Sequence, residues 1–176
     1  MPVRHRAYVI VTVWDTLPEE WLDDRAVLAR RISTDAPMGD LDLEEENWDA
    51  GRVREQWARS RAQGRRSVES VARHLESGRL VGFTDLQISA ATPHLAYQSD
   101  TIVLREHRGH RLGVAMKLAN LAALQRDQPQ VRTIRTWNAR SNEPMLRVNR
   151  EIGFVVTGYM HEWQKQVGRR AIALPT

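Results

Sequence analysis

The chain has 176 residues, a formal net charge of +4 and a sequence pI near 10.1. This length accommodates one well-buried core and is short for two ordinary domains, so we expect a single domain over residues 1–176. The absence of cysteine excludes disulfides, thiolate metal sites and a cysteine nucleophile. The longest apolar run, Ala7–Val13, is too short to cross a bilayer, and no apolar signal segment follows Met1. We therefore expect a soluble cytoplasmic protein.

The basic charge of the chain does not indicate a nucleic-acid partner. The arginines are spread along the sequence, and Lys117 and Lys165 are the only lysines. The sequence has no Arg-Gly repeat, no zinc-finger spacing and no platform of aromatic and basic residues. We therefore expect neither nucleic acid nor a membrane as partner.

The first third of the chain predicts one strand and two helices. Ala7–Trp14 is rich in β-branched and aromatic residues, as strands are. A helix is expected from Thr16 to about Arg31, because a polar capping residue and two acids stand at its start. The second helix, from Asp49 to about Ala62, places Val53 and Trp57 on one face.

Residues 66–104 predict three strands. Arg66–His74 alternates polar and apolar residues, a turn follows at Glu76–Arg79, and Leu80–Ile88 is the returning strand of an antiparallel hairpin. Ala96–Leu104 is the third strand, and it leads directly into a turn that contains glycine.

The stretch Thr101–Leu124 combines a strand, a basic turn with Gly109 and Gly113, and an uninterrupted helix. The first backbone N–H groups of a helix have no internal partner and lie at the positive end of its dipole, so this turn predicts a phosphate site. It is neither a dinucleotide fingerprint nor a P-loop. The alternative is a buried strand followed by an amphipathic helix with a basic cap. Charge around the anion would come from Arg108, His110 and Arg111.

The last third of the chain predicts further strands around one helix. Val131–Trp137 is a strand and Ser141–Ile152 a helix. Phe154–Met160 and Trp163–Val167 are expected to close the sheet, before a basic tail at 167–176. The order of elements gives an α/β fold with a mixed sheet flanked by helices.

Two blocks of the sequence resemble the GNAT superfamily of N-acyltransferases. Arg108–Gly113, with the sequence RGHRLG, resembles the loop that binds the pyrophosphate of acyl-CoA. Thr136–Phe154 resembles the later strand, the asparagine-containing helix and the Gly-Phe of that family. The match covers roughly residues 66–166 and is closest in wording to actinobacterial members, including the C-terminal halves of tandem, mycothiol-synthase-like proteins. The resemblance implies the GNAT fold, a mixed and mostly antiparallel sheet with splayed central strands.

The resemblance also implies that acetyl-CoA, or another acyl-CoA, is the cofactor. Residues 1–65 would then form the acceptor side, and 66–166 the cofactor-binding core. The end of the third strand would pair with the pantetheine arm and offer a backbone N–H to the thioester oxygen, besides its role in the core. Asn138 and Asn142 would bind the cofactor or serve as a turn residue and a helix cap. The implied cofactor-binding residues are Ile102, Val103, Leu104, Arg108, Gly109, His110, Arg111, Leu112, Gly113, Val114, Asn138 and Asn142.

The candidate catalytic residues are Asp100 and Asn149. Asp100 precedes the strand end that would bind the thioester, and apolar neighbours there would raise its pKa toward the working range of a base. The alternative is an ordinary acid at the end of a strand. Asn149 stands where many members carry the tyrosine that protonates the thiolate, and asparagine is no acid. Other candidate bases are His94, Tyr97, Asp85 and Glu162.

An acidic connection joins the first two helices, since residues 33–49 carry seven acids. Acidic loops are usually solvated. In GNAT proteins this segment commonly forms a wall of the acceptor pocket, where acids would attract an amine. The candidate substrate-binding residues are Asp40, Asp42 and Glu44.

The sequence therefore favours an acetyl-CoA-dependent N-acetyltransferase, in which a small-molecule amine attacks the thioester directly in a ternary complex. The alternative is a cofactor-binding or structural GNAT domain without catalysis. The histidines have no metal-ligand spacing and no Gly-x-Ser-x-Gly occurs, so we expect no metal and no serine nucleophile. A homodimer would take the place of a tandem pairing.

Overall fold

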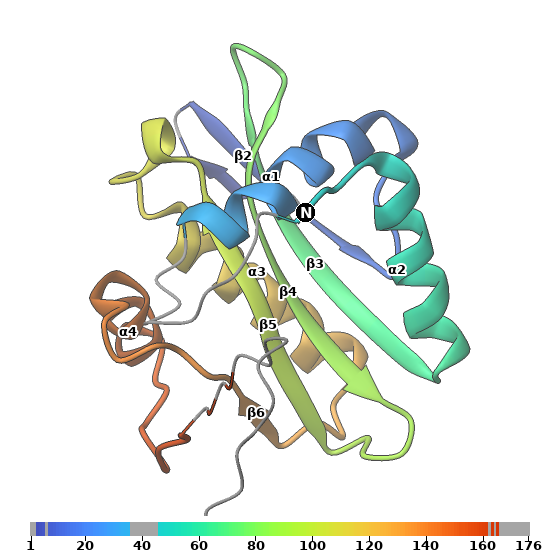
Figure 1. Ribbon diagram of the computed structural model, residues 1–176, viewed down its shortest axis with the longest axis vertical. Coiled ribbons are helices and arrows are strands. Elements are labelled where there is room, and N and C mark those ends of the chain that lie inside the picture. The colour runs from blue at the N-terminus through green and yellow to red at the C-terminus, as the bar shows by residue number, and fades with distance from the viewer. Residues whose placement is uncertain (1–2, 6, 36–45, 162, 164, 166–176) are drawn as a thin grey trace, which may run out of the picture.

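The computed structural model describes residues 3–5, 7–35, 46–161, 163 and 165. Its centre is a six-stranded sheet in which the strands are neighbours in the order of the sequence (Figure 1). All neighbouring strands are antiparallel except the last pair. The strands are β1 (Val3–His5), β2 (Tyr8–Trp14), β3 (Arg65–His74), β4 (Leu80–Ser89), β5 (Leu95–Val103) and β6 (Thr133–Arg135).

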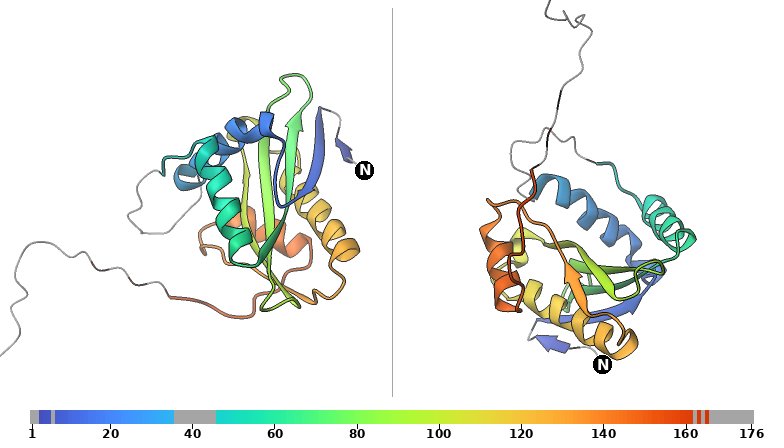
Figure 2. Two further views of the ribbon diagram at one scale, coloured as in Figure 1. Left: turned by 90° about the vertical axis from the view of Figure 1, so that its right-hand side faces the viewer. Right: turned by 90° about the horizontal axis from the view of Figure 1, so that it is seen from below.

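Helices cover both faces of the sheet. Helices α1 and α2 lie on one face, α3 crosses the other, and α4 lies beyond the β6 end of the sheet (Figure 2). Two short 3₁₀ helices, η1 and η2, precede α1 and follow β5. The helices are η1 (Glu19–Trp21), α1 (Leu22–Asp35), α2 (Ala50–Ala62), η2 (Arg105–His107), α3 (Leu112–Asp127) and α4 (Glu143–Glu151).

The helix predicted between residues 49 and 62 is confirmed as α2, and a capping side chain explains where it begins. The side chain of Asp49 accepts a 2.7 Å hydrogen bond from the backbone nitrogen of Arg52, which caps the first turn of α2. Val53 and Trp57 are buried, so the predicted face does pack on the core. The helix predicted from residue 16 starts later, because Pro18 opens η1 and α1 begins only at Leu22.

Two irregularities shape the β5 region of the sheet. The pairing of β5 with β4 jumps from Leu86↔Gln98 to Thr84↔Thr101, so Ser99 and Asp100 both face Asp85 across a bulge. The parallel pairing of β5 with β6 covers only Leu95–Tyr97. From residue 98 onward, the described residues provide no strand along this edge of β5. The predicted mixed sheet with splayed strands is therefore confirmed.

Two strand predictions near the C-terminus need correction. The predicted strand Val131–Trp137 shrinks to the three residues of β6. The described residues 154–161 form no strand, and most of 163–167 lies outside the described residues. A strand needs a neighbouring edge, and β6 offers only a very short one. Large apolar side chains of this segment are exposed as a result: Val155, Val156, Tyr159, Met160 and Trp163.

Among the described residues, no helix combines the length and apolar character required to cross a bilayer.

Candidate active site

The predicted phosphate turn leads from β5 into α3. Gly109 has a φ of 84°, a left-handed conformation that favours glycine, and a Cβ placed there would meet no atom within 4 Å. Arg111 directly precedes α3 and has a φ of 56°, which is uncommon for a residue with a side chain. The N–H groups of the first helical turn, including Leu112, Gly113 and Val114, lack helical partners by geometry. The turn can therefore bind an anion with backbone donors.

The basic side chains of the turn differ in how they are held. Arg108 donates from Nε to the backbone oxygen of Val103, 2.9 Å away, and so ties the turn to the end of β5. Arg111 forms an ion pair with Glu151 of α4. His110 is exposed, with its ring centroid 5.3 Å from that of Tyr8. These contacts keep positive charge on both sides of the glycine turn.

The end of β5 presents part of its backbone to the open edge. The N–H of Leu104 donates to the backbone oxygen of Val81, 2.9 Å away on β4. Successive residues of a strand direct their peptide groups to opposite sides, so Ile102 also turns toward β4 and Val103 turns toward the open edge. Of the three predicted residues, only Val103 directs its N–H toward the open edge, while its backbone oxygen accepts from Arg108. The N–H of Leu104 is already used within the sheet.

Two carboxylates meet at the β5 bulge. Asp85 is buried, and its Oδ1 accepts a 3.1 Å hydrogen bond from the backbone nitrogen of Asp100. Burial, with the negative charges of Asp100 and Glu69, raises the pKa of Asp85 to about 7. The Asp100 side chain keeps a solvent-exposed side, yet desolvation by the surrounding protein raises its pKa, opposed by Arg25 and assisted by Glu46. The pKa of each carboxyl group is thus shifted upward, which is the direction that a carboxylate acting as a base requires.

A buried ion pair lies beside these carboxylates, and the sequence did not reveal it. Arg25 of α1 donates from Nε to Glu69 of β3 at 2.6 Å, and both side chains are about 6% exposed. The guanidinium also lies 3.4 Å from the ring centroid of Phe83. Burial raises the pKa of Glu69 although Arg25 lowers it. One arginine thus faces three carboxyl groups, which leaves the site acidic.

Three asparagines of the predicted site lie around α4. Asn142 caps this helix, because its Oδ1 accepts from the backbone nitrogen of Met145 at 3.3 Å. Asn149 is buried and donates from Nδ2 to Oδ1 of Asn138 at 2.7 Å. Its own Oδ1 is buried without a hydrogen-bond partner among the described residues. The alternative role of Asn142 as a helix cap is confirmed, and its cofactor-binding role stays a prediction. Asn149 is left with one unsatisfied acceptor.

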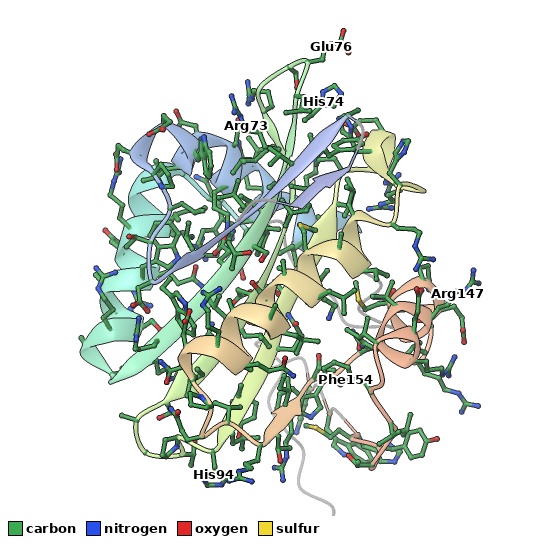
Figure 3. All side chains as sticks on the ribbon, turned by 180° about the vertical axis from the view of Figure 1, so that it is seen from behind. Arg73, His74, Glu76, His94, Arg147 and Phe154 are labelled. Atoms are coloured by element: carbon green, nitrogen blue, oxygen red, sulfur yellow. The ribbon has the colours of Figure 1, made fainter. Side chains whose placement is uncertain are left out.

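Sequence reasoning also missed Lys117. This lysine of α3 is only 2% exposed, and its Nζ lies 5.9 Å from the ring centroid of Phe154 (labelled in Figure 3). Burial lowers its pKa to about 8, although the charge of Asp85 acts in the opposite direction. A lysine within an otherwise apolar stretch of helix is the sequence signal that could have identified it.

Two further candidate bases, His94 and Tyr97, lie before and within β5. His94 precedes β5 and so stands at the opposite end of that strand from the phosphate turn (Figure 3). The ring of Tyr97 stacks on that of Trp137, with centroids 5.6 Å apart. No group of metal-binding side chains occurs in the described part of the chain. Asp40, Asp42, Glu44 and Glu162 lie outside the described residues.

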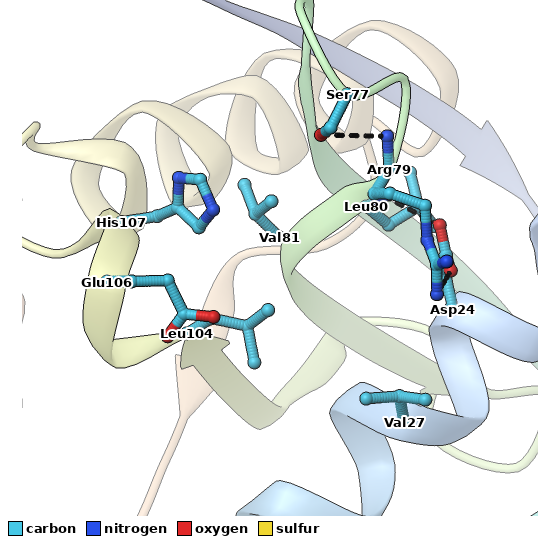
Figure 4. Close-up of a pocket in the computed structure, with 9 residues that line it drawn as sticks. All are labelled: Asp24, Val27, Ser77, Arg79, Leu80, Val81, Leu104, Glu106 and His107. Carbon is cyan, nitrogen blue, oxygen red and sulfur yellow. Dashed lines mark hydrogen bonds and ion pairs between the residues drawn. The ribbon is translucent and has the colours of Figure 1, made fainter.

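A small cavity of about 210 Å³ lies beside the phosphate turn (Figure 4). Its walls come from α1, the β3–β4 turn and η2, and Arg79 and Asp24 form an ion pair within it. Its volume is below the ~300–1,000 Å³ of typical ligand pockets. Leu104, at the end of β5, is the one predicted cofactor-binding residue in its lining.

The chain has the fold of the GNAT acetyltransferases, with a splayed β-sheet and a turn between β5 and α3 that can bind an anion. No family model and no curated protein matches the chain. A solved tandem GNAT protein from the clavulanic acid biosynthesis pathway is 34% identical to it, with a TM-score of 0.65 over 86% of this chain and 43% of that one. The chain thus spans less than half of that protein.

Two further structures share the fold at low identity. The protein yncA of Salmonella typhimurium, solved with its cofactor acetyl-CoA, is 14% identical, with a TM-score of 0.69 over 93% of this chain and 88% of that one. AAC(6′)-Iy, solved with the bisubstrate analogue CoA-S-monomethyl-acetylneamine, is 15% identical, with a TM-score of 0.58 over 90% of this chain and 99% of that one.

Proposed function

We propose that this protein is a GNAT-type acetyltransferase that transfers an acetyl group from acetyl-CoA to the amine of a small molecule. The observation that carries the proposal is the open edge of β5, which leads directly into the glycine turn at Gly109 and the start of α3. An extended arm can pair with this edge while its phosphates bind the turn. The acetyl-CoA and CoA analogue bound by two structures of the same fold support this choice of cofactor.

The reaction would be direct attack by the amine in a ternary complex. Asp100, at the solvent-exposed side of the bulge, takes the amine's proton, and Asp85 holds the backbone of Asp100 from behind. The acidic surroundings favour a cationic substrate. Asp40, Asp42 and Glu44 remain proposed residues of the acceptor wall. The backbone of Val103 is the proposed donor to the thioester oxygen.

The test is thermal melting with and without excess acetyl-CoA. Ligand at a hundred times its dissociation constant adds about 2.7 kcal/mol to the free energy of unfolding. We expect this gain in the native protein and its loss in Gly109→Glu, which puts negative charge in the phosphate turn. Because any side chain strains this left-handed position, the matched control is Gly109→Gln, which has the size of glutamate and bears similar strain without charge. Native protein without a gain would contradict the proposal.

A cofactor-binding domain without catalysis is the second candidate. It is favoured by Asn149, which cannot act as an acid, and by the similarity to part of a tandem protein. Turnover of acetyl-CoA with a panel of amines separates the two, since a silent domain would bind the cofactor and release no CoA.

A homodimer is the proposed assembly of this chain. The exposed apolar side chains at residues 155–163 agree with such pairing. A monomer in light scattering at high protein concentration would contradict it. The mycothiol-synthase-like relationship likewise remains a proposal drawn from the motif wording.

A further inference from the structure

Lys117 is a buried cation that no role so far explains. Its side chain is among the largest that are completely enclosed, and the described residues offer it no ion pair or hydrogen bond. Isolated buried charges are costly, so buried ammonium groups are normally paired. The charge of Asp85 acts on Lys117, but among the described residues no hydrogen bond holds the ammonium, so a bound ligand can supply one.

The unsatisfied acceptor Oδ1 of Asn149 belongs to α4. Phe154, whose ring lies near Nζ of Lys117, donates its backbone N–H to the backbone oxygen of Asn149 at 2.9 Å. Lys117 and Asn149 thus approach the same phenylalanine from α3 and α4. Reversing the amides of Asn149 and Asn138 would leave a buried donor unpaired instead of the acceptor, so one polar atom there lacks a partner in either case.

Helix α3 starts at the phosphate turn, and α4 is tied to that turn by the ion pair of Arg111 with Glu151. Lys117 and Asn149 therefore lie on the two helices that meet at the turn, beside the path that the proposed function gives the pantetheine arm. An acyl-CoA arm carries amide N–H donors next to a sulfur that becomes negative when the thioester breaks. The free acceptor of Asn149 suits an amide donor, and the ammonium of Lys117 suits the developing thiolate. The two unsatisfied groups therefore match the two kinds of group that this arm carries.

We propose that Lys117 is a catalytic residue that donates a proton to the CoA thiolate, in place of the acid that Asn149 cannot be. This inference rests on the proposed function. The amine nitrogen bonds to the carbonyl carbon, the carbon–sulfur bond breaks, and its electron pair moves to sulfur. A proton from Nζ then gives the CoA thiol, and the neutral amine of Lys117 regains a proton from solvent. The lowered pKa of Lys117, about 8, lies close to that of a thiol, which suits this transfer.

The first test needs no acceptor substrate. The thiol of CoA is titrated in complex with the protein by the ultraviolet absorbance of the thiolate. We expect the thiol pKa in the native complex to fall by about one unit, a tenfold change in the ionisation constant, because a cation favours the thiolate. In Lys117→Met or Lys117→Gln the pKa returns to that of free CoA. Lys165→Met, at the exposed second lysine, is the matched control and keeps the shift.

The second test separates proton donation from simple attraction. Lys117→Arg keeps the positive charge but does not release a proton in the working pH range. We expect it to retain the lowered thiol pKa and to lose turnover by about 10²–10⁴-fold.

Three outcomes would overturn the proposal. A native complex with an unshifted thiol shows that Lys117 does not reach the sulfur, and this result needs no variant to fold. Native turnover by Lys117→Arg excludes proton donation. Failure of the native protein to bind CoA rejects the proposed function as well, which distinguishes that failure from the first two.

Discussion

The Oδ1 atom of Asp85 accepts a hydrogen bond from the backbone nitrogen of Asp100 across the β5 bulge, at 3.1 Å. This contact fixes two carboxyl residues at the one place where the β4–β5 register slips. The bulge turns Asp100 toward solvent while Asp85 stays buried. The ionisation of either carboxyl group opposes the ionisation of the other, so the two groups titrate as a coupled pair.

Asp85→Asn is expected to remove a pH dependence of stability. In the folded protein the pKa of Asp85 is about 7, above the ordinary value of 3.8 for an aspartate, so the folded state binds this proton more tightly. The stabilisation is complete below about pH 4 and is lost as the pH rises through 7. At about pH 8 the free energy of unfolding in urea should be higher for the variant than for the native protein, by on the order of 2–4 kcal/mol, with a smaller difference at pH 4. The control is Asp23→Asn, an exposed acid of α1. Parallel stability curves for native protein and Asp85→Asn would contradict the shift.

Asp100→Asn is expected to lower kcat by about 10²–10⁴-fold, because an amide cannot accept the amine's proton. The melting shift caused by acetyl-CoA should remain, since Asp100 lies outside the phosphate turn. The native rate should fall as the pH is lowered, and it should start to fall at a higher pH than for an ordinary carboxylate base, because the pKa of Asp100 is raised. Steady-state kinetics across pH with a reactive amine measure both effects. Full turnover of the variant at every pH would remove Asp100 from the mechanism.

Arg25→Met is expected to destabilise the protein by about 3–5 kcal/mol, because it leaves Glu69 buried without its cation. The double variant Arg25→Met with Glu69→Leu should recover part of this loss, since it removes the unpaired Glu69 while Asp85 and Asp100 still lack the arginine. Denaturant unfolding measures both. The matched control is Arg54→Met, which breaks an exposed ion pair with Glu19 and should cost less than about 1 kcal/mol. Equal losses in Arg25→Met and the control would show that the buried pair contributes no more than a surface one.

Regular elements were predictable where the sequence has a clear period. The β3–β4 hairpin follows from the alternation of Arg66–His74 and the turn after it, and α2 follows from Val53 and Trp57 four residues apart. Phe154–Met160 is equally rich in strand-forming residues, yet it forms no strand. Strand propensity reflects packing against neighbours, and the sequence does not say which edge is available.

The phosphate turn of the candidate site was predictable, but its charged interior was not. Gly109 and the start of α3 follow from local signals of turn and helix. The pairing of Arg25 with Glu69 joins α1 to β3, and only the tertiary fold brings these elements together. Lys117 sits in a helix whose apolar stretch suggests a plain core face. Its burial depends on how α3 crosses the sheet, which no local pattern specifies.

The conformation of Arg111 gives a prediction that is independent of catalysis. A side chain in the left-handed region costs roughly 1–2 kcal/mol, and glycine avoids most of this cost. Arg111→Gly and Arg111→Ala both lose the exposed ion pair with Glu151, so the difference between their free energies of unfolding reports only the backbone strain at residue 111. We expect the glycine variant to be more stable by about 1 kcal/mol in denaturant unfolding.

The reverse change provides the control for Arg111. Gly109→Ala puts a side chain into the second left-handed position of the same turn, where it meets no neighbouring atom, so only backbone strain changes. The free energy of unfolding of Gly109→Ala should be about 1 kcal/mol lower than that of the native protein. Equal stability of Arg111→Gly and Arg111→Ala, beside a measurable loss in Gly109→Ala, would show that residue 111 leaves the left-handed conformation in solution. The start of α3 would then lie at a different residue, and the phosphate donors would shift with it.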